Sequence, residues 1–333
     1  MTAASIDLLI GDPYWLPHPV QLMGKFITIL QRKVENIAGK NKFALRVGGG
    51  IIAIAVVLAS GASGWLIERL IMQKTTLISF YGYLFLLLGL ASSLATRSLR
   101  DSVVNVLNPL SKLSSTCPES LEIAREKLSF IVGRDVSQLS EDEILRATAE
   151  TASENSVDGI YAPLFWMFFG SFLWELSNQL PGPLALAWAF KASSTLDSML
   201  GYRVGKLKWL GTFGARLDDV LTWIPCRIVV FTLPFISKPL HKIPGIINNA
   251  FIDGRKDPSP NSGLSESIFA YCCGITMGGL NVYQGKEKLK PKIASHEPKP
   301  SIRSIEKLLN LILNLELFWL ATILIIKYLT YLL

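Results

Sequence analysis

The sequence predicts an all-α, polytopic integral membrane protein with a water-facing helical insert and polar active-site loops. Half of its 333 residues are hydrophobic and only 18% are charged, whereas about a quarter of the residues of a soluble protein are charged. The mean hydropathy is positive, at +0.37. Long uncharged runs also alternate with basic, polar segments, as membrane helices alternate with their loops.

Three apolar stretches predict membrane helices. One covers the 21 uncharged residues 47–67 and another the 22 uncharged residues 75–96. An α-helix needs about 20 apolar residues to cross the hydrocarbon core of a bilayer. The C-terminal stretch 308–333 is interrupted only by Glu316 and Lys327, and it predicts a third membrane helix.

The segment 97–158 has the composition of a water-facing insert. It carries 7 Lys/Arg and 11 Asp/Glu residues. Apolar side chains recur with helical spacing over 121–131 and 142–155. Ser140 followed by Glu143 is typical of a capping box at the start of the second helix.

The segment 159–190 is predicted to return the chain to the side from which it came. It is apolar but broken by Glu175 and by a Pro-Gly-Pro turn at 181–183. Each half is short for a full span, so we expect a helical hairpin or a re-entrant pair.

The remaining apolar runs are weaker. The run 228–237 has ten residues and contains Pro234, so we expect it to be interfacial or buried. The glycine-rich run 267–285 is not expected to span the membrane. The segment 286–307 carries 7 Lys/Arg residues and is predicted to be a basic linker. The chain would then consist of a catalytic domain over 1–285, this linker and the helix 308–333.

Charge placement predicts the orientation and excludes some partners. Lys+Arg exceed Asp+Glu by 33 to 26, a net charge of +7, and nearly all of the cations lie in the polar segments. The positive-inside rule places those segments in the cytoplasm, facing anionic lipid. No basic stripe with interleaved aromatic residues is present, so nucleic acid is not an expected partner. The four cysteines have no CxxC spacing, which argues against a disulfide framework or structural zinc.

A row of charged residues leads into the apolar segment at 159. Arg146, Glu150, Glu154 and Asp158 follow one another at intervals of four, so on a helix they share one face. The common interpretation is a solvated face with ion pairs. Carboxylates at a membrane boundary are costly without a cation, however, and together with an Asn155 oxygen they suit Mg²⁺ that also binds substrate phosphates.

Four further polar clusters lie beside apolar runs. A proline-rich turn holds Asp12 and His18, and the stretch 191–203 concentrates hydroxyl and charged side chains. Asp218 and Asp219 lie between two arginines, a composition that suits a phosphate–Mg²⁺ site. The last cluster is the turn-rich segment 253–263.

Some motifs are absent from the sequence. There is no GxxxxGK[ST] phosphate loop, no GxGxxG, no HExxH and no GxSxG. A nucleotide would therefore have to be held by carboxylate-bound Mg²⁺ and by basic side chains.

Six strings of the sequence carry a family resemblance: GDPYWLPHPVQLMG, GRDVSQL, RATAETASENSVDGIYAPLFW, KASSTLDSMLGYR, FGARLDDVLTWIPCR and DGRKDPSPNSG. In this order, over residues 6–285, they closely resemble the CobD/CbiB family of cobalamin biosynthesis, the membrane-bound adenosylcobinamide-phosphate synthases. Ser194 stands where the family usually has Asn, Cys226 where it has Ala, and Asp257 where His is common. The acidic and basic motif residues are retained.

The resemblance implies a carbon–nitrogen ligase of the cell membrane with its active-site loops in the cytoplasm. ATP would be its co-substrate and Mg²⁺ its cofactor. It would join the propionate of adenosylcobyric acid to (R)-1-aminopropan-2-ol or to its O-phosphate. A homo-oligomer, or contact with other corrinoid-pathway enzymes, is compatible with this role.

We expect the site residues to fall into three groups. The metal would be held by Glu150, Glu154, Asp158, Asp218 and Asp219. The catalytic group comprises Asp12, His18, Lys191 and Asp197, and the sequence does not choose between His18 and Asp197 as the proton acceptor. Contacts to substrate or ATP are expected from Asn155, Thr195, Ser198, Tyr202, Arg203, Arg216, Arg227, Ser259 and Asn261.

Other functional classes remain open at this point. An intramembrane prenyltransferase also binds Mg²⁺-diphosphate through aspartates, but its usual DxxxD or DDxxD spacing is absent here. A transporter would show inverted repeats, and the two halves have no self-similarity. A non-catalytic membrane regulator would be expected to have lost the charged motif residues.

Overall fold

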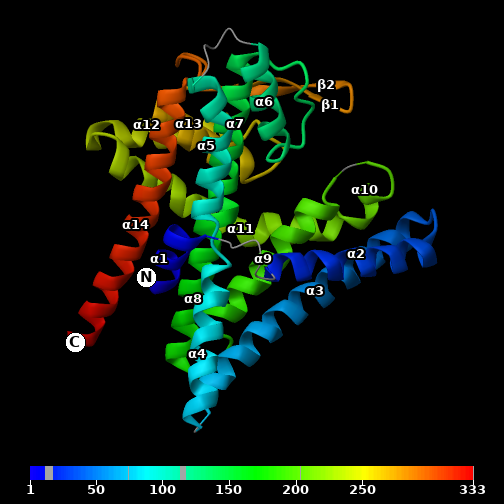
Figure 1. Ribbon diagram of the computed structural model, residues 1–333, viewed down its shortest axis with the longest axis vertical. Helices are drawn as coiled ribbons and strands as arrows, with labels where there is room; N and C mark the ends of the chain where they lie inside the picture. The colour runs from blue at the N-terminus through cyan, green and yellow to red at the C-terminus, as the bar shows by residue number, and fades with distance from the viewer. Residues whose placement is uncertain (12–17, 74, 113–117, 203, 333) are drawn as a thin grey trace. The chain divides into compact units, whose positions relative to one another are not determined.

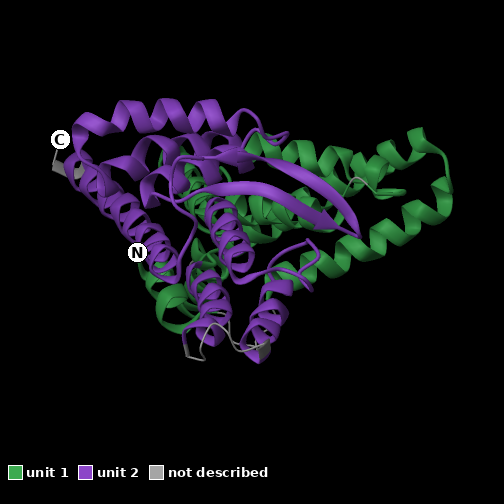
Figure 2. Cartoon of the chain, turned by 90° about the horizontal axis from the view of Figure 1, so that it is seen from above, with its two compact units in different colours: residues 1–95, 158–222 green, residues 96–157, 223–333 purple. Residues whose placement is uncertain are grey.

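The computed structural model describes residues 1–11, 18–73, 75–112, 118–202 and 204–332. The chain forms two compact units, each assembled from separate stretches of sequence (Figure 2). Unit 1 comprises residues 1–95 and 158–222, and unit 2 comprises residues 96–157 and 223–333.

Unit 1 is helical throughout its described part (Figure 1). Its elements are α1 (Thr2–Ile10), α2 (Pro19–Ala38), α3 (Lys42–Ile71), α4 (Thr76–Ala91), most of the π turn η1 (Val157–Tyr161), α8 (Ala162–Leu176), α9 (Pro183–Leu200), α10 (Leu207–Leu210) and the first part of α11 (Thr212–Ser237).

Helices α2, α3, α9 and α10 share one apolar core. Its fully buried members include Ile27, Ile52, Val56 and Leu196. Gly49 lets α10 approach α3 closely, because a Cβ atom there would lie only 1.9 Å from the carbonyl oxygen of Leu210. This packing gives α9 a rigid support for the polar residues of its second half.

A buried carboxylate from α3 caps the N-terminus of α9. Glu68 of α3 is 1% exposed and accepts hydrogen bonds from the amides of Gly182 (2.8 Å), Leu184 (2.7 Å) and Ala185 (3.2 Å). These are amide groups that a helix N-terminus leaves without intrahelical partners. The negative charge also complements the helix dipole.

Unit 2 combines helices with one small sheet. Its elements are α5 (Thr96–Lys112), α6 (Pro118–Ser129), α7 (Glu141–Ser156), the remainder of α11, η2 (Leu240–Lys242), α12 (Ile243–Gly254), α13 (Ser262–Cys273), β1 (Met277–Tyr283), β2 (Lys286–Ile293) and α14 (Ile302–Leu332). The strands pair antiparallel, and Gln284 and Gly285 form a two-residue turn in which both φ angles are positive. Such turns match the twist of a β-hairpin.

The structure confirms the predicted fold class. In the part of the chain that is described, four helices are long and apolar enough to cross a membrane: Lys42–Ile71, Thr76–Ser111, Thr212–Ser237 and Ile302–Thr330. They include the predicted spans 47–67, 75–96 and most of 308–333. The predicted capping box is also present, with the amide of Ser140 donating to Glu143 Oε2 at 2.8 Å.

Over 159–190, where a helical hairpin or a re-entrant pair is expected, the structure has two helices joined by a turn. Helices α8 and α9 pack against each other on either side of a turn at 177–182. Gly170 allows the close approach, because a Cβ atom there would lie 2.4 Å from the carbonyl oxygen of Gly182.

One local prediction was wrong, and another stays a prediction. The run 228–237, expected to be interfacial or buried, is the second part of the 26-residue helix α11, in which Pro225 and Pro234 are accommodated. The first half of the predicted linker 286–307 is strand β2, whose partner β1 lies in the glycine-rich run 267–285. Within that run the chain forms the end of α13 and strand β1.

We expect Glu68→Gln to destabilise unit 1. Both Glu68 oxygens face amide donors, so a glutamine NH₂ group would leave at least one buried amide without an acceptor, at a cost of about 1–3 kcal/mol. Thermal unfolding in detergent measures the loss. Glu122→Gln, at an exposed position, is the matched control, and equal melting temperatures for the two variants would contradict the capping role.

Candidate functional site

Asp218 is a buried carboxylate in unit 1, and one of its oxygens accepts no hydrogen bond in the described part of the chain. It lies on α11 and is 9% exposed, and its Oδ1 atom has no hydrogen-bond partner among the described residues. One turn later, Thr222 Oγ1 is buried without a partner in the same described part of the chain. Residues four apart share a helix face, so both orphaned oxygens belong to one face of α11. Buried polar atoms without partners are rare and indicate a missing water, ion or ligand.

Four charged residues act electrostatically on Asp218. They are Asp158 of η1, Lys191 and Asp197 of α9, and Asp219 of α11. The group thus contains four carboxylates and one ammonium, so negative charge is in excess. The fold brings these groups together from three separate stretches of sequence. This cluster is called the aspartate cluster below.

The aspartate cluster fits Mg²⁺ that arrives with phosphate oxygens. In the described part of the chain, no group of three or more His, Cys, Asp or Glu residues is arranged to hold a metal ion by itself. Mg²⁺ usually binds through only one or two carboxylates and completes its coordination with water and substrate phosphates. The orphaned oxygen of Asp218 and its neighbour Asp219 supply such a donor pair.

Of the predicted substrate-contacting residues near this cluster, two hydroxyl groups bond to backbone carbonyls, and two longer side chains are exposed. Thr195 Oγ1 donates to the carbonyl of Lys191 (2.6 Å), and Ser198 Oγ donates to that of Ser194 (2.9 Å). The Tyr202 side chain is exposed. Arg216 is 76% exposed and lies 3.9 Å from Asp219 Oδ2, so its guanidinium is free to turn toward a ligand.

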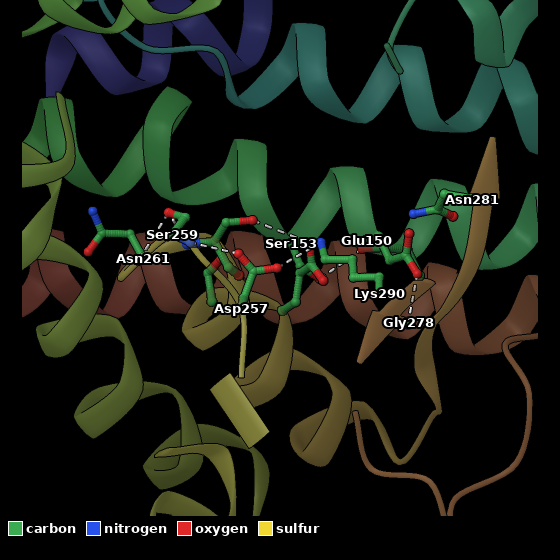
Figure 3. Close-up of polar contacts among 12 residues, drawn as sticks. Glu150, Ser153, Asp257, Ser259, Asn261, Gly278, Asn281 and Lys290 are labelled. Atoms are coloured by element: carbon green, nitrogen blue, oxygen red, sulfur yellow. Dashed lines mark hydrogen bonds and ion pairs between the residues drawn. The ribbon is translucent and has the colours of Figure 1, made fainter. Parts of the chain in front are cut away.

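Glu150 is the centre of a second polar network, in unit 2 (Figure 3). Its Oε1 atom accepts from Arg146 NH1 (3.0 Å) and from the amide of Gly278 (2.8 Å), and its Oε2 atom pairs with Arg134. Arg146 also donates to the carbonyls of Gly278 (3.1 Å) and Leu280 (2.8 Å), while Arg134 donates to Asn281 Oδ1 (2.6 Å). These bonds attach the β-hairpin to α7.

Lys290 of β2 extends the same network. Its ammonium lies 2.5 Å from Glu266 Oε1 and 3.7 Å from Asp257 Oδ2. Glu266 is fully buried in α13, and its Oε2 atom has no partner among the described residues. Glu154, predicted as a metal ligand, belongs to the electrostatic surroundings of this lysine and of Glu266.

Burial and neighbouring charges set the protonation of the network. Burial would raise the pKa of Glu150, but Arg134, Arg146 and Lys290 hold it below its ordinary value. Burial raises the pKa of Glu266 to about 8, an increase that the ammonium of Lys290 only partly offsets. Burial opposes the charge of Lys290, yet the carboxylates around it raise its pKa. With Glu266 protonated, the cations and remaining carboxylates of the network balance.

Arg227 binds a loop of its own unit. It stacks on Trp223, 4.3 Å from the ring centroid, and donates to Asn261 Oδ1 (2.6 Å) and to the carbonyl of Pro260 (3.0 Å). Ser259 Oγ accepts from the amides of Asn261 and Ser262 at 3.3 Å. These contacts order the loop 257–262, and the predicted contacts of Arg227, Ser259 and Asn261 with substrate or ATP stay predictions.

The predicted metal row is altered in two ways. Both oxygens of Glu150 are occupied by two arginines and an amide, so Glu150 is an anchor for the hairpin and we leave it out of the proposed metal ligands. The α-helix ends at Ser156 and a π turn follows, so the regular spacing of four does not extend to Asp158. Asn155 is exposed.

The N-terminal candidates are only partly described. His18 is the N-cap of α2, and its Nδ1 atom accepts from the amide of Val20 at 3.3 Å. In this position the imidazole caps a helix, which is a structural role. Asp12 and Arg203 lie outside the described residues.

The sequence did not reveal several residues that join the polar clusters only in the folded chain. Lys290 was assigned to a linker and Asn281 to an apolar run, and the only turn signal between them is Gly285, whose φ is positive in the structure. Glu266 was the lone acidic residue before that apolar run. Thr222 could have been found by its spacing of four from Asp218.

Comparison with known proteins identifies similar chains. The family model described as CobD/Cbib protein matches residues 1–312. The cobalamin biosynthesis protein CobD of Synechocystis sp. is 40% identical over 290 residues, which are 87% of this chain and 79% of the relative. The cobalamin biosynthesis protein CbiB of Salmonella typhimurium is 36% identical over 319 residues, 95% of this chain and 91% of the relative. No solved structure matches the chain.

We expect Glu150→Gln to destabilise the hairpin of unit 2. Removing one partner of a buried ion pair costs about 3–5 kcal/mol, because the remaining charges lose their compensation. Hydrogen exchange of the amides in 277–293 should therefore accelerate, and the melting temperature should fall. A variant with unchanged exchange but weaker Mg²⁺ binding would restore Glu150 to the metal site.

We expect the stability of unit 2 to fall as the pH rises from 6 to 9. The folded-state pKa of Glu266 is raised from 4.5 to about 8, so its contribution is complete below pH 4.5 and is lost as the pH rises through 8. The limiting slope is about 1.4 kcal/mol per pH unit. Glu266→Gln, which stays neutral, should have a flatter pH profile in thermal unfolding. Parallel profiles for the variant, the wild type and the exposed control Glu122→Gln would contradict this assignment.

Proposed function

Since the chain belongs to the CobD/CbiB family, we propose that it acts in cobalamin biosynthesis as an ATP-dependent ligase at the membrane. It would form the amide between the propionate of adenosylcobyric acid and (R)-1-aminopropan-2-ol or its O-phosphate. The family model and the curated relatives support the pathway. The amide-forming reaction rests on the chemistry of the aspartate cluster.

The observation that carries the proposal is the buried, unsatisfied carboxylate of Asp218 among three other aspartates and one lysine. Such a site repels anions unless a divalent cation accompanies them. Mg²⁺ bound to nucleotide phosphates supplies that cation, and its chemistry would be to neutralise charge on the phosphates. Binding of Mg-ATP through carboxylates is consistent with the sequence, which has no GxxxxGK[ST] phosphate loop.

The residues of the cluster divide the work of the reaction. Asp218 and Asp219 would hold the metal, while the ammonium of Lys191 would contact a phosphate. Arg216 would turn its exposed guanidinium toward the nucleotide, because its ion pair with Asp219 is long, at 3.9 Å. These groups act by positioning and by electrostatics in a partly buried site.

The covalent steps need two bond exchanges. A propionate oxygen attacks a phosphorus atom of ATP and displaces either ADP or diphosphate, which gives an acyl phosphate or an acyl adenylate. The amine nitrogen then attacks the carbonyl carbon, and phosphate or AMP leaves. The nitrogen must lose its protons, and we assign their acceptance to Asp197, which lies in the cluster. Its carboxylate is near enough to Asp218 to share the same field.

The helices support a membrane location for this chemistry. Four described helices are long and apolar enough to cross a bilayer. Asp218 lies only six residues from the start of one of them, Thr212–Ser237. A charged site near the end of a spanning helix suits a water-soluble nucleotide, which reaches the membrane surface from the cytoplasm.

We expect Asp218→Asn to abolish ligation while the protein still inserts and folds. Asparagine has nearly the same shape but no charge, so Mg-ATP would lose a ligand and its binding should weaken. The test supplies the purified protein with cobyric acid, aminopropanol or its phosphate, and Mg-ATP, and detects corrinoid amides by mass spectrometry. ATP binding and corrinoid binding are measured separately.

Three outcomes would decide the assignment. Loss of Mg-ATP binding in Asp218→Asn with unchanged corrinoid binding supports it, provided that the exposed control Glu122→Gln stays active. Normal Mg-ATP binding with lost corrinoid binding would move the cluster to the corrinoid pocket. Absence of any amide product from the wild-type protein would overturn the proposed reaction.

A further inference from the structure

Helix α2 has an apolar face that the protein leaves uncovered. Leu22, Phe26, Ile29 and Ile37 follow one another at helical spacing and are 56%, 38%, 53% and 87% exposed. An adjacent arc of the same helix, which includes Met23 and Ile27, packs into the core of unit 1. The apolar surface of α2 is therefore about twice as wide as the core requires.

Three cations gather around one indole that packs against the same core. The ring of Trp209 lies 4.5 Å from the guanidinium carbon of Arg46, 5.3 Å from Lys42 Nζ and 5.4 Å from Lys208 Nζ. Trp209 is held there because α10 packs tightly against α3 at Gly49. This cluster is called the Trp209 cluster below.

The cations of the Trp209 cluster have no acidic partner in the described part of the chain. Lys206, the next cation along, is 3.9 Å from Glu35, but Lys42, Arg46 and Lys208 form no ion pair there. Three exposed positive charges held within reach of one ring repel one another. An anion would relieve that repulsion and complete the cluster.

The length of α3 places the cluster at the level of lipid headgroups. A helix of 30 residues is about 45 Å long, whereas the hydrocarbon core of a bilayer is about 30 Å thick. The uncharged part of α3 begins after Arg46, so its first turn lies outside the hydrocarbon. Tryptophan and basic side chains are typical of this interfacial layer.

We propose that the exposed face of α2 and the Trp209 cluster form a binding surface for anionic phospholipids of the surrounding bilayer. The apolar face of α2 would lie at the boundary between headgroups and acyl chains, as in interfacial amphipathic helices. The cations of the Trp209 cluster would bind the phosphate and the anionic headgroup. The apolar face favours a lipid over a soluble phosphate, because a soluble anion leaves that face in water. This inference does not depend on the proposed ligase reaction.

The test measures quenching of Trp209 by brominated lipids. The full-length protein is reconstituted in bilayers of equal parts phosphatidylglycerol and phosphatidylcholine, in which one or the other lipid is brominated high in its acyl chain. Subtracting the signal of Trp209→Phe from that of the parent protein isolates Trp209 from the other tryptophans. We expect stronger quenching by brominated phosphatidylglycerol, and we expect added salt to weaken this preference.

Removing the cations should remove the preference. Each basic residue near an anionic surface contributes roughly a fivefold factor in binding, so replacing Lys42, Arg46 and Lys208 by glutamine should lower the relative affinity for phosphatidylglycerol at least about tenfold. The matched control removes the same charge from exposed residues of the hairpin: Lys286, Lys288 and Lys292. It should leave the preference unchanged.

Several results would overturn the proposal. Equal quenching by the two lipids in the wild-type protein would exclude a headgroup preference. Complete competition by soluble glycerol phosphate would show a site for a free anion. Absence of quenching by both lipids, with protection of Trp209 that depends on protein concentration, would assign the surface to a second copy of the chain.

Discussion

Burying a carboxylate costs free energy unless donors replace the water that it loses, and this constraint organises both units of the protein. Glu68 meets it with three backbone amides and thereby begins α9. Glu150 meets it with two arginines and one amide, and thereby attaches the β-hairpin to α7. In both cases the carboxylate holds together segments that are distant in sequence. The two residues therefore contribute to the fold, although one of them had the appearance of a metal ligand.

Glu266 and Asp218 meet the same constraint incompletely. Glu266 has one lysine for its two oxygens, and its raised pKa means that a proton supplies the remaining compensation near neutral pH. Asp218 keeps an orphaned oxygen in a field of three other aspartates. A bound cation is the simplest compensation for that field, and a cation bound to phosphates is what an ATP-dependent ligase needs. Glu68 and Glu150 therefore have structural roles, whereas Glu266 and Asp218 each keep an oxygen that can still bind a proton or a ligand.

The membrane imposes the second constraint. Four helices in the described part of the chain can cross a bilayer, and the polar segments between them must remain in water or bind headgroups. The proposed ligase joins a large water-soluble corrinoid to a small amine, so its site must open to the aqueous side. The Trp209 cluster and the uncovered face of α2 belong to the boundary itself, where apolar and cationic groups are both satisfied.

The sequence by itself determined the membrane class and the family, and it predicted apolar helices over 47–67 and 75–96, because hydropathy and motif order are properties of contiguous residues. It also singled out Asp158, Asp197 and Asp218 before the fold joined them. Only the tertiary structure decided that Glu150 and Arg227 are occupied by internal partners, and that Lys290 enters a buried network from a segment resembling a linker. The physical reason is that spacing along a helix shows which side chains share a face, whereas the availability of an oxygen depends on donors brought from other elements. A hydrogen bond formed across 128 residues, such as that from the amide of Gly278 to Glu150, leaves no periodic trace in the sequence.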